Sequence, residues 1–165
     1  MIIGIVGSRG FGSRKNDKAV ENYVDAFVSG LYNYHVLFDV KSVTVLSGGA
    51  RGVDRFVERA CLVRRMSFVK ALPKLLKYGS PRAFHVRNDF IIKMSDRIVA
   101  FWNGANIRRS GTCSVIRKAL KQKKEVLILV YVKETDTFHK VPHKAFRKID
   151  RMLRKQEKRR NRKCR

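Results

Sequence analysis

The stretch Ser47-Gly48-Gly49-Ala50-Arg51-Gly52-Val53-Asp54 decides the fold. It follows the apolar, β-branched run 42–46, and it precedes apolar residues at helical spacing: Val53, Phe56, Val57, Ala60 and Cys61. The pattern predicts a strand, a glycine-rich turn and a helix start. Free backbone N–H groups at a helix N-terminus favour a bound anion, and glycines let the backbone approach it closely. The spacing is neither a Walker A loop nor a GxGxxG fingerprint, so a simple tight connection is the alternative.

The same alternation of strand and helix runs outward in both directions. We expect strands over residues 2–6, 67–72, 97–102 and 125–131. Helices are expected from Asn16 or Asp17, from the Ser80-Pro81 pair with Ser80 as N-cap, and from Ser110. This order predicts an α/β protein with a three-layer, Rossmann-like architecture and a mostly parallel, doubly wound sheet. Ligands of such sheets bind beyond the carboxyl ends of the strands, where the loops 7–13, 47–54 and 103–112 are expected.

Charge is the second strong signal. The 165 residues hold 38 Lys or Arg against 13 Asp or Glu, a net charge of +25. Residues 144–165 contribute 12 basic and two acidic side chains, a net charge of +10, which leaves +15 on residues 1–143. We therefore predict a nucleotide-binding domain over 1–143, and a basic C-terminal helix and tail over 144–165. A polyanionic partner is expected, nucleic acid before an anionic membrane surface, and a generally basic proteome is the alternative.

Cysteine and histidine spacing predicts neither disulfides nor a metal site. The three cysteines, at positions 61, 113 and 164, are scattered, and the four histidines lack metal-ligand spacing. The chain opens on an apolar strand without a basic leader, and its longest apolar run, 126–132, is too short to cross a bilayer. We expect a cytoplasmic, reducing location, no metal, no cofactor and no membrane partner.

Five motifs, taken in order, resemble those of the SLOG superfamily, and especially the YspA-like proteins and the core of the DprA/Smf DNA-processing proteins. They are Gly7-Ser8-Arg9, the opening stretch 47–54, Arg87-Asn88, Ser95-Asp96 and Ser110-Gly111-Thr112. The resemblance covers residues 2–131. It implies a strand-end pocket for nucleotides, nucleotide-derived ligands or nucleic-acid phosphates. It also implies that the chain can pair into homo-oligomers through helix faces.

The motifs supply the candidate binding residues. We predict nucleotide or phosphate contacts from Gly7, Ser8, Arg9, Ser47, Gly48, Gly49, Ala50, Arg51, Gly52, Asp54, Arg87, Asn88, Ser110, Gly111 and Thr112. Asp54 either orients a ribose or an arginine, or only stabilises its helix. The alternative for Arg87 is an ion pair with Asp54 or Asp89. Phe11 and Trp102 are candidates for base stacking, with core packing as the alternative for Trp102.

The expected function is non-catalytic binding. In LOG-like phosphoribohydrolases a glutamate follows the Gly-Thr pair by three residues, but Val115 stands at that position, and its side chain cannot move a proton. The leading hypothesis is a DprA-like binder of single-stranded nucleic acid. The alternative is a sensor or sponge for a cyclic nucleotide or an ADP-ribose derivative, and a LOG-like hydrolase comes after both.

Overall fold

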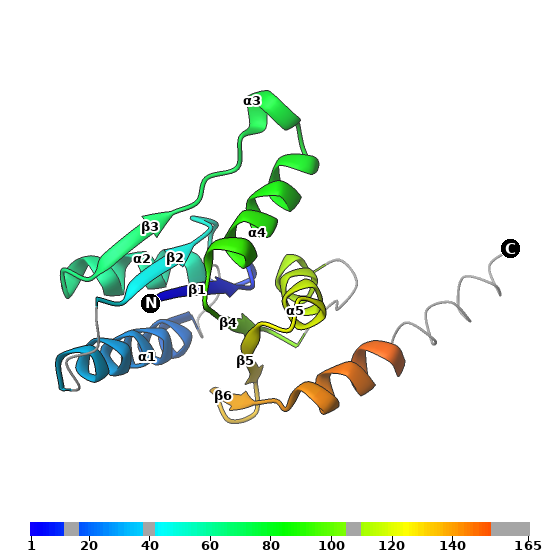
Figure 1. Ribbon diagram of the computed structural model, residues 1–165. Coiled ribbons are helices and arrows are strands. Elements are labelled where there is room, and N and C mark those ends of the chain that lie inside the picture. The colour runs from blue at the N-terminus through cyan, green and yellow to red at the C-terminus, as the bar shows by residue number, and fades with distance from the viewer. Residues whose placement is uncertain (12–16, 38–41, 105–109, 153–165) are drawn as a thin grey trace, which may run out of the picture.

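A computed structural model describes residues 1–11, 17–37, 42–104 and 110–152 of the chain (Figure 1). Its six strands form one sheet in the order β3-β2-β1-β4-β5-β6. Strands β1 to β5 are parallel to their neighbours, and β6 runs antiparallel to β5. The predicted mostly parallel, doubly wound sheet is confirmed.

The strands arise where apolar, β-branched residues are consecutive, as expected for strands covered on both faces. They are β1 (Ile2–Gly7), β2 (Thr44–Ser47), β3 (Ser67–Lys70), β4 (Arg97–Trp102), β5 (Glu125–Val132) and β6 (Thr137–Lys140). β1 is central, with Ile3 beside Val45 of β2 on one side and beside Arg97 of β4 on the other. This register brings the carboxyl ends of β1, β2 and β4 to the same edge of the sheet.

Helices cover both faces of the sheet, and each face has its own hydrophobic core. α1 (Asp17–Leu37) and α2 (Val53–Val63) cover one face, where Val20, Val24 and Val28 of α1 are buried. α4 (Arg82–Met94) and α5 (Gly111–Lys121) cover the other. The helical residues 143–152 pack against this second core through Phe146, which is buried beside Trp102.

Three local features differ from the elements expected from the sequence. β6 is not among the expected strands. The connection after β3 contains the one-turn helix α3 (Leu75–Tyr78). Ser80 is not the N-cap of α4: the helix begins at Arg82, Pro81 takes the cap position after a cis peptide bond, and no side chain caps the first turn.

No helix among the described residues is long and apolar enough to span a membrane.

Candidate nucleotide site

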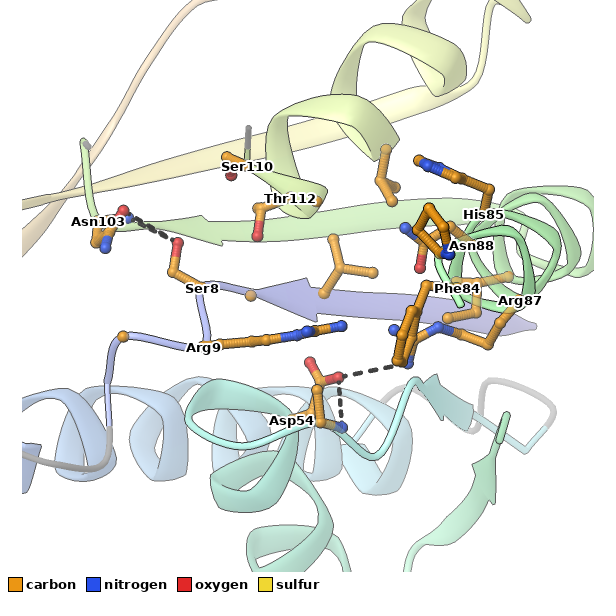
Figure 2. A pocket seen from close by; sticks show the side chains of 18 residues that line it. Ser8, Arg9, Asp54, Phe84, His85, Arg87, Asn88, Asn103, Ser110 and Thr112 are labelled. Carbon is orange, nitrogen blue, oxygen red and sulfur yellow. Dashed lines mark hydrogen bonds and ion pairs between the residues drawn. The ribbon is translucent and has the colours of Figure 1, made fainter. Parts of the chain in front are cut away.

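Loops from three parallel strands meet α4 at one end of the sheet and enclose a cavity of about 400 Å³. Figure 2 shows Ser8 and Arg9 after β1, Asp54 at the start of α2, and Ser110 and Thr112 at the start of α5. The cavity brings together ten of the predicted residues, which are Gly7, Ser8, Arg9, Ala50, Asp54, Arg87, Asn88, Ser110, Gly111 and Thr112. The strand ends therefore bring most of the predicted residues together around one cavity.

A second cavity of about 550 Å³ adjoins the first. Its lining includes Gly48, Gly49 and Arg51, and it shares Arg9, Ala50 and Phe84 with the first cavity. The two remaining predicted residues, Ser47 and Gly52, line neither cavity. Ser47 is fully buried at the end of β2, and Gly52 packs against the backbone of the loop that follows β1.

Asp54 occupies part of the anion site that the glycine-rich turn was expected to offer. The Ala50 amide donates a hydrogen bond to Asp54 Oδ2 at 3.1 Å, so the turn already binds a carboxylate of its own chain. The side chain is 4% exposed. Burial raises the pKa of Asp54 to about 6, although the Ala50 amide and the Arg87 guanidinium both act to lower it.

Arg87 projects from α4 toward the same turn and is 8% exposed. Its Nη1 donates to the carbonyl oxygen of Gly48 and lies 4.0 Å from Asp54 Oδ2. A Cβ on Gly48 would lie 1.7 Å from this nitrogen, so only glycine allows the approach. Burial lowers the pKa of Arg87, the nearby Asp54 opposes that change, and the positive charge of Arg9 adds to it. The alternative expectation, a pair with Asp54, is thus part of the observed geometry.

Three buried polar atoms at this end of the sheet have no hydrogen-bond partner among the described residues. They are Ser47 Oγ, Asp54 Oδ1 and Arg87 Nε. Buried polar atoms in folded proteins are nearly always paired, with protein, water or ligand. Asp54 and Arg87 both line the cavity, so its wall contains one unpaired acceptor and one unpaired donor, both of them buried atoms.

The cavity walls at the end of β1 and at the start of α5 are held by different hydrogen bonds. Ser8 Oγ donates to Asn103 Oδ1 at 3.2 Å and accepts from the Asn103 amide at 3.1 Å, so this hydroxyl holds the ends of β1 and β4 together. Ser110 is the N-cap of α5, its Oγ accepting from the Cys113 amide at 3.2 Å. The first amides of a helix have no carbonyl partner inside it, so the N-terminus of α5 adds donors and a partial positive charge to the cavity wall.

Neither aromatic residue expected to stack on a base is available for it. Phe11 is 6% exposed and packs edge-on against Tyr131 and Phe138. Trp102 is 3% exposed and packs against Phe146. That expectation is corrected, because both rings belong to the hydrophobic cores.

The aromatic side chain at the site is Phe84, which is not among the residues predicted from the sequence. It is only partly buried and lines both cavities, and the Arg9 guanidinium carbon lies 4.8 Å from its ring centroid (Figure 2). A signal for it existed: Phe84, Asn88 and Ile91 recur at helical spacing with Arg87, and all of them line the first cavity.

Two side chains among the described lining residues are of types that transfer protons, Asp54 and His85. Asp54 is the one carboxylate among the described residues that line either cavity. Asp89 points elsewhere, in an ion pair with Lys118. Val115, at the position of the hydrolase glutamate, presents a buried apolar side chain to the cavity. Within the described part of the chain, no three His, Cys, Asp or Glu side chains are placed to share a metal ion.

Known proteins resemble the chain in fold. No family model and no curated protein matches its sequence. DNA processing protein A (DprA) from Streptococcus pneumoniae superposes with a TM-score of 0.54 and 18% identity, over 76% of this chain and 49% of that one. The protein TM1055 superposes with a TM-score of 0.57 and 21% identity, over 76% of this chain and 71% of that one. The chain spans about half the length of DprA, and it has the Rossmann-like fold of DprA and the SLOG proteins.

Proposed function

We propose that the protein is a non-catalytic binder of phosphate-bearing ligands of the nucleotide type, and that its main ligand is single-stranded nucleic acid. The observation that carries this proposal is the convergence of Arg9, Arg87, a glycine-rich turn and the N-terminus of α5 on one cavity at the strand ends. The likeness of fold to a DNA processing protein supports the nucleic-acid reading.

The position of Asp54 indicates where a phosphate would bind. Its carboxylate repels an anion once it is ionised, above a pH of about 6. A phosphate is therefore better placed toward Arg9 and the first turn of α5 than against the Ala50 amide, which Asp54 already holds. Ser110 and Thr112, at the start of α5, lie across the cavity from Asp54 (Figure 2).

The excess of positive charge favours a polyanion over a single small nucleotide. A net charge of +15 lies outside the C-terminal 22 residues, so the folded body itself attracts a strand of phosphates. Each phosphate neutralised on a single strand contributes about −0.7 to the slope of log K against log salt. We therefore expect binding that weakens steeply as salt rises and depends little on sequence.

Filter binding of a labelled single-stranded oligonucleotide across a salt series tests the proposal. The double variant Arg9→Ala/Arg51→Ala should bind at least tenfold more weakly than the unchanged protein, with a salt slope smaller by roughly 1.4. The control is Lys121→Ala/Lys123→Ala, which removes the same charge from exposed positions that line neither cavity. The affinity of this control variant for the oligonucleotide should fall by no more than about threefold. No detectable binding at low salt would refute the proposal.

The C-terminal tail is a separate candidate for the same activity. Residues 155–165 hold seven basic side chains and one acid, and they can bind nucleic acid independently of the cavity. Deleting them should reduce affinity while preserving the difference between the Arg9/Arg51 variant and its control. If the deletion alone abolishes binding, the tail carries the function.

A second candidate function is a sensor or sponge for a nucleotide-derived signal. The first cavity lies in the size range of small-molecule sites, and the unused Asp54 Oδ1 and Arg87 Nε could fix one ligand. Thermal shift with mononucleotides, cyclic nucleotides and ADP-ribose derivatives tests it, because a ligand that binds only the folded chain raises the melting temperature. If none of these compounds raises it, this candidate is eliminated.

A further inference from the structure

Two side chains, together with Ala50, line both cavities. Arg9, from the loop after β1, reaches toward Phe84 of α4, and both residues line both cavities (Figure 2). The guanidinium lies over the phenyl ring at 4.8 Å, a cation–π contact between the two shared side chains. The shared lining therefore has an aromatic face and a positive charge.

The first cavity is built to take a polar group as well as an apolar one. Asp54 and Arg87 are both more than nine-tenths buried, and each keeps an unused hydrogen-bonding atom. The side chains of Val6, Ile91 and Val115 supply apolar lining. This combination suits a nucleoside, whose base has apolar faces and whose sugar and base edges both donate and accept hydrogen bonds.

The second cavity has a different lining that suits the next unit of a strand. It contains the Gly48-Gly49 backbone, Arg51 and Pro73, and no carboxylate. Gly49 has a φ of 64°, a conformation that favours glycine, and the Lys70 side chain packs where a Cβ would stand. A phosphodiester that connects ligands in the two cavities must pass Arg9.

From these observations we infer that the cavities are adjacent subsites for two consecutive nucleotides, with Phe84 as the stacking platform for a base and Arg9 as the contact to the phosphate between them. This inference rests on the proposed function and adds to it a minimum ligand length and a specific stacking residue. Bases stack on phenyl rings and on guanidinium planes alike, so the pair can serve a base from either side.

Competition against a labelled 12-nucleotide oligothymidylate tests the inference with 5′-phosphorylated oligothymidylates of one, two and three nucleotides. The dinucleotide should compete at least tenfold better than the mononucleotide, because it gains a stacked base and a phosphate contact. Adding the third nucleotide should increase the affinity less than adding the second. Equal affinity for one and two nucleotides would overturn the inference while leaving the proposed function intact. If the protein binds none of the probes, both the inference and the proposed function are overturned.

The variants identify Phe84 as the source of the gain. Phe84→Leu keeps an apolar side chain without an aromatic face, so it should reduce the dinucleotide advantage to less than about threefold. Phe84→Tyr should restore the advantage. The matched control is Phe90→Leu, an exposed aromatic on the same helix that lines neither cavity, and it should change nothing. A Phe84→Leu variant that retains the full dinucleotide advantage would also overturn the inference.

Discussion

Asp54 at the start of α2 and Arg87 in α4 form a buried ion pair, Oδ2 to Nη1 at 4.0 Å, between helices that cover opposite faces of the sheet. They meet beyond the ends of the strands, where no sheet separates the two layers. Arg87 also donates to the Gly48 carbonyl, and Asp54 accepts from the Ala50 amide. The pair therefore holds the glycine-rich turn from both sides and places one positive and one negative side chain in the wall of the cavity.

The first prediction concerns the loss of Arg87. Arg87→Met should lower the free energy of unfolding by about 3 kcal/mol at pH 7, because it leaves the Asp54 carboxylate buried without its cation. Urea denaturation measures the change. The control is Lys118→Met, which breaks the exposed pair with Asp89 between α4 and α5 and should cost less than about 1 kcal/mol. Equal losses in the two variants would contradict a special role for the buried pair.

The second prediction is a pH dependence that originates in Asp54. Its pKa is raised from 3.8 to about 6 in the folded chain, so the folded state holds the proton more tightly than the unfolded state does. The stabilisation from protonated Asp54 is complete below about pH 4 and is lost as the pH rises through 6. The loss amounts to roughly 3 kcal/mol. An Asp54→Asn variant lacks this pH dependence, because the asparagine side chain does not titrate.

Urea denaturation at several pH values between 4 and 7 checks this sign. As the pH rises from 4 to 7, the unchanged protein should lose unfolding free energy relative to the Asp54→Asn variant. A difference that stays constant over this range would show that Asp54 titrates normally.

The layered fold was predictable because long apolar runs and amphipathic helices report burial directly. The valines of α1 and the Ser110 cap of α5 lie as the sequence indicates. β6 was not predictable, because only Phe138 of its four residues is buried and the strand depends on pairing with β5.

The site was predictable as a set of loops but not as a set of contacts. The strand-end rule brings Arg9, Ala50 and Ser110 together, since parallel strands end at one edge. This rule cannot predict that the Asp54 carboxylate accepts a hydrogen bond from the Ala50 amide, or that Phe84 lines the cavity. Both follow from the way α4 packs across the strand ends, which the local sequence does not encode.

The third prediction compares two glycines that should respond to alanine with opposite signs. Gly52 has a φ of 78°, and a Cβ there would lie 2.5 Å from the Phe11 carbonyl oxygen and 2.6 Å from that of Ser8. Gly52→Ala should therefore destabilise the chain by about 2 kcal/mol or more and weaken oligonucleotide binding, because the loops after β1 and β2 must separate. Gly30 lies within α1, and a Cβ there meets nothing within 4 Å.

Gly30→Ala should stabilise the chain by up to about 1 kcal/mol, since alanine has the higher helix propensity. Thermal denaturation followed by circular dichroism measures both changes. A neutral Gly52→Ala variant would contradict the tight packing between the two loops, and a destabilised Gly30→Ala variant would contradict the open space around Gly30.

The fourth prediction tests whether the helical residues 143–152 belong to the folded core. Phe146 is fully buried, and its ring centroid lies 6.0 Å from that of Trp102, the single tryptophan of the chain. Phe146→Ala should lower the unfolding free energy by about 3 kcal/mol. It should also shift the Trp102 emission to longer wavelength, because the space left by the phenyl ring exposes the indole to water. Met152 is half exposed on the same helical segment, so Met152→Ala should change stability by less than about 0.5 kcal/mol and leave the emission unchanged. Emission that is the same in both variants would place the segment outside the core, and nucleic-acid binding by residues 144–165 would then be independent of the domain that carries the cavity.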